Sequence, residues 1–152
     1  MASSLSTIDE LTRGDHTFLS TADECYYLGE YTSRAGDSFS ETNRLIQNLK
    51  KPMDRKGKPE WTHKEQAILK FGQQLRIALN DDFLGQATLI PVPPSSKVDD
   101  PNYDDRMLRV LRTMQASDQF DIREIVTMRI NLDPVHLHDG PRSVENLVKA
   151  FK

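Results

Sequence analysis

The sequence predicts a single α/β domain whose sheet is partly parallel. Segments rich in β-branched and aromatic residues alternate with amphipathic helical segments, a pattern that favours strands joined through helices. The length of 152 residues suits one domain. One apolar run, Thr88–Val92, has the composition of a strand that is covered on both faces. Together these observations predict a sheet flanked by helices, in the order β-α-α-β-α-β-α.

The first expected strand follows a polar lead-in. We assign residues 1–22 to this lead-in and residues 23–152 to the domain. Cys25–Thr32 is rich in tyrosine, which is typical of a strand. Ser38 with Glu41 has the spacing of a capping box and predicts the start of the first helix. The apolar face of that helix is expected to contain Phe39, Leu45, Ile46 and Leu49.

The second helix and the central strand come next. Thr62 with Glu65 forms another capping-box pattern, and the helix is expected to run to about Asn80. Its expected apolar face consists of Ile68, Phe71, Leu75, Ala78 and Leu79. Asp81–Gly85 should close the helix before the Thr88–Val92 strand begins.

The last third of the chain predicts a helix, a strand and a final helix. Asp104 and Asp105 suit the N-terminus of the first of these helices, because carboxylates there interact favourably with the helix dipole. Its apolar face is expected to contain Met107, Leu108, Leu111 and Met114. Ile122–Ile130 is interpreted as a strand, and Ser143 as the cap of the last helix.

The loop after the central strand is a candidate anion-binding site. Pro91 has no backbone N–H, so the strand ladder should end there. Ser95, Ser96 and Lys97 then offer two hydroxyls and one cation at the carboxyl end of a strand, where open α/β sheets bind ligands. A Pro-Pro-Ser-Ser run is also typical of a solvated linker, so the loop alone leaves both interpretations open.

Three segments in their order resemble a known enzyme family. They are Tyr27–Tyr31 followed by Leu45–Lys51, the Pro91–Lys97 strand and loop, and the helix start at Tyr103–Arg106. Over roughly residues 24–151 the arrangement is similar to the amino-terminal part of a phosphoribosyltransferase, in the ComF-like branch. The resemblance implies that Ser95, Ser96 and Lys97, with Arg106 nearby, hold the pyrophosphate of phosphoribosyl pyrophosphate, and that Mg²⁺ accompanies this ligand.

One defining motif of that family is missing. The family has a buried strand that ends in two acidic residues, followed by a Thr-Thr-Gly loop around the 5′-phosphate. Asp99–Asp100 and Asp104–Asp105 have neither the preceding apolar strand nor the following loop. We therefore expect a module that binds a phosphorylated ribose or nucleotide and acts as a glycosyltransferase only if a partner or a missing C-terminal half supplies this loop.

The missing strand also predicts association. A sheet without it leaves a strand edge and apolar surface uncovered, so a homo-oligomer or a dedicated protein partner is expected. A second hypothesis is a non-enzymatic, degenerate relative that senses nucleotides or binds proteins, in a bacterial stress or defence system. A third is a nucleic-acid accessory protein that uses the basic Lys50–Trp61 loop.

Composition argues against several other classes. A net charge of −3 produces no field that attracts nucleic acid or an anionic membrane. A single cysteine permits no internal disulfide and favours a reducing, cytoplasmic location.

Four isolated side chains also have chemistry that a site could use. His136 and His138, with Asp133 and Asp139, are weak candidates for metal ligands and otherwise a polar loop. We interpret Cys25 as a core residue rather than a nucleophile. His63, near a helix start, is expected to be exposed.

Overall fold

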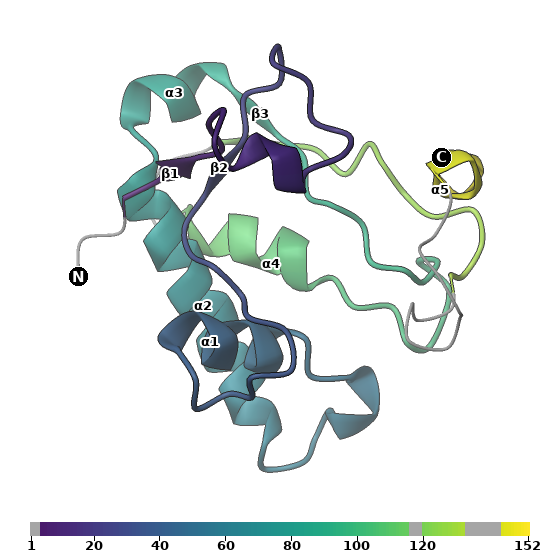
Figure 1. Cartoon of the computed structure of the whole chain (residues 1–152). Helices are drawn as coiled ribbons and strands as arrows, with labels where there is room; N and C mark the ends of the chain where they lie inside the picture. Colours follow the sequence, from purple (N-terminus) through teal and green to yellow (C-terminus); the bar gives the residue numbers. More distant parts are fainter. Residues whose placement is uncertain (1–3, 116–119, 133–143) are drawn as a thin grey trace.

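A computed structural model describes residues 4–115, 120–132 and 144–152, and shows a mixed α/β arrangement. Three helices pack side by side in one part of the molecule, and two small sheets lie beside them (Figure 1). The expected fold class, a sheet with helices, is therefore confirmed, whereas the expected order of elements is not. Two elements that were not expected, a first strand and a short third helix, lengthen the observed order.

The N-terminal sheet is an antiparallel pair formed by β1 (Ser6–Thr7) and β2 (Tyr26–Tyr27). The strand expected over Cys25–Thr32 is thus only two residues long, and its partner comes from the segment assigned to the lead-in. A short 3-10 helix, Arg13–Asp15, lies between the two strands. After β2 the chain approaches the first helix so closely that a Cβ atom on Gly29 would lie 2.5 Å from the hydroxyl oxygen of Thr42.

Helix α1 (Glu41–Leu49) begins two residues later than the capping-box pattern indicated. Its N-cap is Ser40, whose hydroxyl accepts a 3.0 Å hydrogen bond from the backbone N–H of Asn43. Ser38 is therefore not the cap. Phe39 precedes the helix and is 61% exposed, so its expected place on the apolar face is also wrong. The side chain of Asn43 is fully buried because the preceding loop satisfies all its polar atoms.

Helix α2 (Trp61–Ala78) packs against both α1 and α4 (Arg106–Thr113) to form the core. The core cluster contains Leu49, Ala67, Ile68 and Val110, flanked by Leu45, Phe71, Leu75 and Met107. Gly72 permits the close crossing, because a Cβ atom there would lie 2.8 Å from the carbonyl oxygen of Val110. Met114 is also buried, as the apolar pattern predicted.

The expected capping box at the start of α2 is wrong. Neither Thr62 nor Glu60, the residue at the N-cap position, makes a side-chain cap hydrogen bond. Glu65 instead forms an ion pair with Arg109 of α4. The Glu65 carboxylate, which the local pattern assigned to capping α2, therefore makes a tertiary contact between two helices instead. A 3-10 turn, Met53–Arg55, connects α1 to α2.

The central strand is shorter and more exposed than predicted. Helix α3 (Asp81–Gln86), capped by Asn80, leads into β3 (Thr88–Leu89), which pairs in parallel with β4 (Asp121–Ile122). Ile90 is 45% exposed and Val92 is 72% exposed, so the prediction of a strand covered on both faces is wrong. Among the described residues the sheet has two strands, which is too few to bury both faces of either one.

The segment after β4 runs beside the C-terminal residues instead of continuing as the nine-residue strand that was expected. Met128 forms an antiparallel bridge with Phe151, which follows helix α5 (Val144–Ala150). The backbone N–H groups of Thr127 and Arg129 donate to the carbonyls of Lys152 and Ala150. Ser143, the expected cap of this helix, lies outside the described residues.

No helix in the described part of the chain combines the length and apolar character that a bilayer crossing requires.

Candidate functional site

A buried lysine fixes the start of α4 relative to α1 and α2. Lys64 is 1% exposed, and its ammonium donates to the carbonyls of Leu49 (3.0 Å) and Lys51 (2.7 Å) and to Oδ2 of Asp104 (2.6 Å). Burial lowers the pKa of Lys64, and the Asp104 carboxylate partly offsets this effect. Because a lysine ammonium has three donors, all of its capacity is used here.

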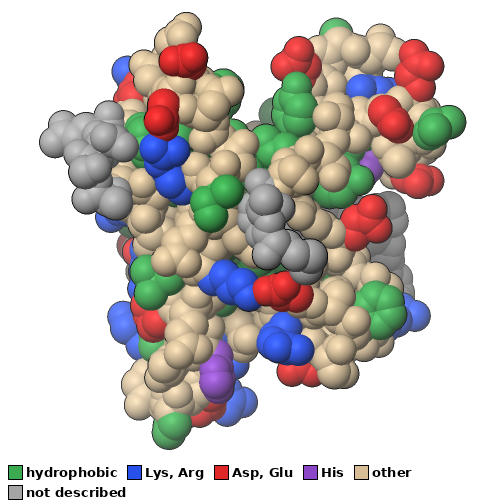
Figure 2. Space-filling view, turned by 90° about the vertical axis from the view of Figure 1, so that its left-hand side faces the viewer, with side chains coloured by type: hydrophobic (Ala, Val, Ile, Leu, Met, Phe, Trp, Pro, Cys, Tyr) green, Lys and Arg blue, Asp and Glu red, His purple; other side chains and the backbone are tan. Residues whose placement is uncertain are grey.

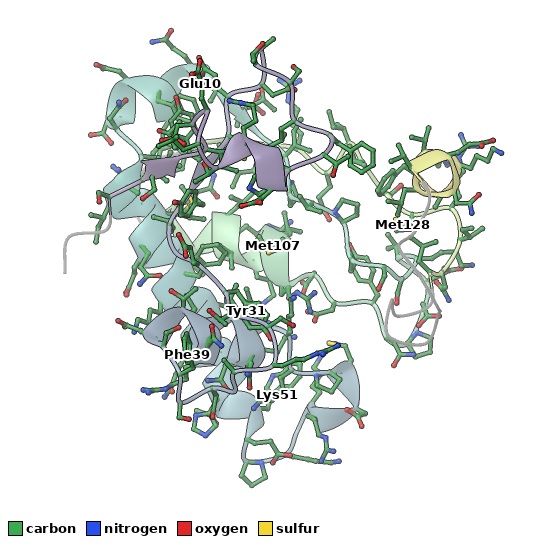
Figure 3. The ribbon with its side chains drawn as sticks, in the orientation of Figure 1. Glu10, Tyr31, Phe39, Lys51, Met107 and Met128 are labelled. Atoms are coloured by element: carbon green, nitrogen blue, oxygen red, sulfur yellow. The ribbon has the colours of Figure 1, made fainter. Side chains whose placement is uncertain are left out.

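A crevice lies between the start of α4 and the segments that follow β3 and β4. Its walls include the apolar side chains of Val92, Met107 and Met128. Met107 is carried by α4, and Met128 lies toward α5 (Figure 3). The polar side chains in its lining are Ser96, Tyr103, Asp104, Asp105, Glu124 and Thr127. The crevice has a volume of about 20 Å³, which is room for about one water molecule.

The parallel pair β3–β4 explains why these side chains meet. Parallel strands place their carboxyl ends at the same edge, so the residues after β3 and those after β4 come together there. The Ser95–Lys97 loop is held in this position by two hydrogen bonds. The N–H of Leu132 donates to the carbonyl of Ser95 (2.8 Å), and the N–H of Lys97 donates to Oδ1 of Asn131 (2.8 Å).

Of the four residues expected to hold pyrophosphate, one lines the crevice. Ser96 lines the crevice, whereas Ser95, Lys97 and Arg106 are not among the lining residues. The Lys97 ammonium lies 3.3 Å from a carboxylate oxygen of Asp99. The Arg106 guanidinium lies 2.9 Å from Oδ2 of Asp104. Both expected cations are therefore paired with carboxylates of the same chain.

Two residues in the first turn of α4 line the crevice, which the sequence did not indicate. These residues are Met107 and Leu108, and the N–H of Arg106 just before them donates to Oδ1 of Asp104 (3.2 Å). Uncapped N–H groups at a helix N-terminus favour an anion. The Asp104 carboxylate, which would oppose an anion, contacts both Lys64 and Arg106, so two cations compensate one negative charge.

Sequence reasoning missed the acidic side of the crevice. Asp105 and Glu124 both line it, and the hydroxyl of Tyr103 lies 3.4 Å from Oε1 of Glu124. Burial raises the pKa of Tyr103, and the Glu124 carboxylate raises it further. The signal that could have found Glu124 is its place two residues after β4, the partner of the strand that leads to Ser96.

The carboxylates in the crevice lining bear on the expectation of Mg²⁺. Within the described residues no group of three or more His, Cys, Asp or Glu side chains is placed to hold a metal. Mg²⁺ in proteins is commonly bound through one or two carboxylates together with substrate phosphates. Asp105 and Glu124 provide that number of carboxylates at the crevice.

The other sequence candidates lie elsewhere. His136 and His138 fall outside the described residues. His63 is exposed, as expected. Cys25 is half-buried and not in a disulfide. In the basic loop Trp61 is half-buried, and the Lys64 ammonium lies 5.2 Å from its ring centroid, so a face that could stack on a base is already in use.

Comparison of the chain with protein-family models, with curated proteins and with solved structures finds no match.

Proposed function

We propose that this chain is a phosphoribosyltransferase-like module that binds the diphosphate of a phosphorylated ribose or nucleotide, together with Mg²⁺, at the crevice beside Ser96. The observation that carries the proposal is that Ser96 and the first turn of α4 line the same crevice, where the segments after the parallel strands β3 and β4 meet. A phosphate oxygen accepts hydrogen bonds from hydroxyls and from helix N–H groups.

In this proposal each residue has a defined part. Ser96 and the N–H groups of Met107 and Leu108 donate to phosphate oxygens. Mg²⁺ neutralises the diphosphate, and Asp105 and Glu124, which both line the crevice, are the carboxylates that we assign to it. Lys97 adds a cation once the diphosphate competes with Asp99. The ligand needs more room than the crevice offers, and the Ser95–Lys97 loop can provide it by giving up its hydrogen bonds to Leu132 and Asn131.

Catalysis by this chain alone is not part of the proposal. The Thr-Thr-Gly loop that would hold the 5′-phosphate is missing from the sequence. A further polypeptide would have to supply it, and the exposed Ile90, Val92 and Ile125 near the parallel pair offer that polypeptide an apolar surface.

Calorimetric titration with magnesium pyrophosphate tests the binding site. Ser96→Ala removes a hydrogen bond to a charged group, so we expect affinity to fall roughly 10-fold or more. Ser38→Ala is the matched control, because Ser38 is exposed and lies outside the crevice lining. Asp99→Asn should strengthen binding, since it frees the Lys97 ammonium. Equal affinity in wild type, Ser96→Ala and Asp99→Asn would reject this site.

A second candidate function is a protein-interaction module without turnover. It is favoured by the pairing of Lys97 and Arg106 with carboxylates of their own chain, which weakens the case for a ready anion site. The titration with magnesium pyrophosphate distinguishes the two functions. Magnesium pyrophosphate binding supports the first, and its absence in a folded sample supports the second.

A further inference from the structure

The connection between α1 and α2, the basic Lys50–Trp61 loop, concentrates positive charge in an acidic chain. It contains five basic and two acidic residues, a net charge of +3. The whole chain has a net charge of −3, so the residues outside the loop sum to −6. The overall charge is therefore the sum of a basic loop and a more strongly acidic remainder.

The two carboxylates of the basic loop approach the same cation. Asp54 lies 3.7 Å and Glu60 lies 3.5 Å from guanidinium nitrogens of Arg55. The other cations of the loop have no carboxylate partner among the described residues, and they are all lysines: Lys50, Lys51, Lys56 and Lys58. Four ammonium groups within nine residues are thus available to an external anion.

The backbone of the basic loop has a defined shape. The 3-10 turn Met53–Arg55 lies near its centre, and the N–H of Lys58 donates to the carbonyl of Arg55 (3.1 Å). The buried ammonium of Lys64 holds the start of the loop through the carbonyl of Lys51 (2.7 Å). A backbone that is already ordered loses less conformational entropy when its side chains meet a ligand.

The basic loop lies far from the most acidic segment of the chain. It is at the bottom of Figure 1, whereas β1, β2 and the connection between them are at the top. That connection, residues 8–25, has five acidic residues and one arginine, a net charge of −4. Figure 3 labels Glu10 at the upper end of the molecule and Lys51 at the lower end.

Distance and salt separate these two charged ends. Figure 2 shows Asp and Glu side chains gathered on the upper right lobe, and several Lys and Arg side chains on the lower half. At physiological ionic strength the Debye length is about 8 Å, so exposed charges at opposite ends of a protein screen out. An anion beside the basic loop is therefore attracted by the loop and hardly repelled by the acidic remainder.

The surroundings of the loop select the kind of anion. The loop contains none of the large, strongly exposed apolar side chains of the described residues, whereas protein interfaces and membrane-surface segments bury such side chains. Single-stranded nucleic acid stacks its bases on open aromatic rings. An ammonium already lies over each nearby ring, Lys64 over Trp61 and Lys50 over Tyr31, at 5.2 and 5.6 Å from the centroids. What remains is a contact made by charge alone.

We propose that the basic loop binds the phosphate backbone of a nucleic-acid duplex without regard to base sequence. A DNA duplex carries one negative charge per about 1.7 Å of its axis, and lysines that neutralise phosphates release its condensed counterions. Lys56 and Lys58, which are both exposed, make the central contacts, and Lys50 and Lys51 add to them where α1 ends. The crevice beside Ser96 shares no lining residue with the loop, so this inference does not rest on the function proposed there.

Fluorescence anisotropy of a short labelled DNA duplex, titrated with the full chain at several salt concentrations, tests the proposal. With four lysines on four phosphates, a plot of log K against log salt concentration should have a slope of about −3.6. Lys56→Gln with Lys58→Gln should reduce that slope by about 2 and weaken binding roughly 10-fold or more at about 50 mM salt. Both side chains are exposed, so far-UV circular dichroism should show unchanged folding.

The matched control removes the same charge elsewhere. Lys70 and Lys149 have side chains that are 48% and 68% exposed, and neither belongs to the basic loop. Lys70→Gln with Lys149→Gln should therefore leave the slope unchanged. If both double variants weaken binding equally, net charge rather than the loop is responsible and the proposal is wrong.

Release of Arg55 provides a test in the opposite direction. Asp54→Asn with Glu60→Gln removes both carboxylates beside its guanidinium, so a fifth cation should contact the duplex and steepen the slope by about 1. Glu10→Gln with Asp82→Asn, which changes two exposed carboxylates outside the loop, should have no such effect.

Several results would overturn the proposal. They are absence of duplex binding at about 50 mM salt, or a slope that Lys56→Gln with Lys58→Gln leaves unchanged. Stronger binding to a single strand of the same sequence, or displacement of the duplex by phosphatidylserine vesicles, would also overturn it, because either result assigns the loop to a different anion.

Discussion

Replacement of Lys64 by methionine is the sharpest test of how this fold is held together. The ammonium of Lys64 joins the end of α1, through the carbonyls of Leu49 and Lys51, to Asp104 at the start of α4. Lys64→Met keeps the apolar stem and leaves three acceptors without this donor. Removal of one member of a buried ion pair destabilises proteins by about 3–5 kcal/mol. Small domains have a total stability of about 5–15 kcal/mol, so the variant should lose a large part of it.

The measurement is urea unfolding followed by circular dichroism, with the slope compared between variants. Lys70→Met is the matched control on the same helix. Lys70 also pairs with a carboxylate, Glu41, but its side chain is 48% exposed, so the loss should be at most about 1 kcal/mol.

The double variant Lys64→Met with Asp104→Leu checks whether the two side chains act through their contact with each other. In Lys64→Met the Asp104 carboxylate keeps the Arg106 guanidinium as its one charged partner, and the two substitutions remove the same contact, so their losses of stability should not add. A loss below about 1 kcal/mol for Lys64→Met, or one no larger than that of Lys70→Met, would show that the buried ammonium does not hold the helices together.

Three further predictions concern packing, capping and pH. Gly72→Ala should destabilise the α2–α4 crossing by about 1–3 kcal/mol in urea unfolding, because its Cβ atom would lie 2.8 Å from the Val110 carbonyl oxygen. Gly85→Ala, in α3 with no atom within 4 Å of its Cβ position, should be neutral or stabilising by the same measurement. Asn43→Ala should cost about 2–3 kcal/mol, more than the roughly 1 kcal/mol of Ser40→Ala, because it leaves the Thr32 N–H and the carbonyls of Thr32 and Gly36 without their partner. The hydrogen bond from Arg109 lowers the pKa of Glu65 below 4.5, so this pair should stabilise the fold at pH values above 4.5 and lose that effect as the pH falls through the lowered pKa. The stability difference between wild type and Glu65→Gln, at most about 1 kcal/mol since the side chain is 39% exposed, should therefore disappear in acid unfolding experiments.

Each of these predictions has a clear contrary result. Equal stability of Gly72→Ala and wild type would mean that α4 can move away from α2 without loss. A smaller effect for Asn43→Ala than for Ser40→Ala would mean that the loop before α1 contributes little. A Glu65→Gln difference that persists at low pH would assign the effect to packing of the side chain rather than to its charge.

Local sequence patterns predicted the helices better than their ends. The spacing of Leu45 and Leu49, and of Ile68, Phe71 and Leu75, places these residues in or against the core as expected. The apolar face of a helix follows directly from its 3.6-residue period. The capping boxes at Ser38 and Thr62 failed because neighbouring polar groups compete for the same role: Ser40 caps α1, and Glu65 pairs with Arg109 of another helix.

The candidate site was only partly predictable because its polar side chains also have competing partners. The loop composition drew attention to Ser96, and its position after a strand follows from the chain order. The pairing of Lys97 with Asp99 and of Arg106 with Asp104 depends on side-chain geometry that no spacing rule gives. The approach of Glu124 to the crevice required the register of β3 against β4.

The sequence by itself determined that the segments of α1, α2 and α4 are helical, though not that of α3, and which loop contains adjacent hydroxyls, because periodicity and side-chain chemistry are local properties. Tertiary structure alone decided that Lys64 is buried, that Val110 rather than Phe39 joins the core, and that the central strand is exposed. The physical reason is that burial depends on what packs against a residue. A lysine can leave solvent when two carbonyls and a carboxylate from distant segments meet its three donors, and a β-branched strand stays exposed when too few strands surround it.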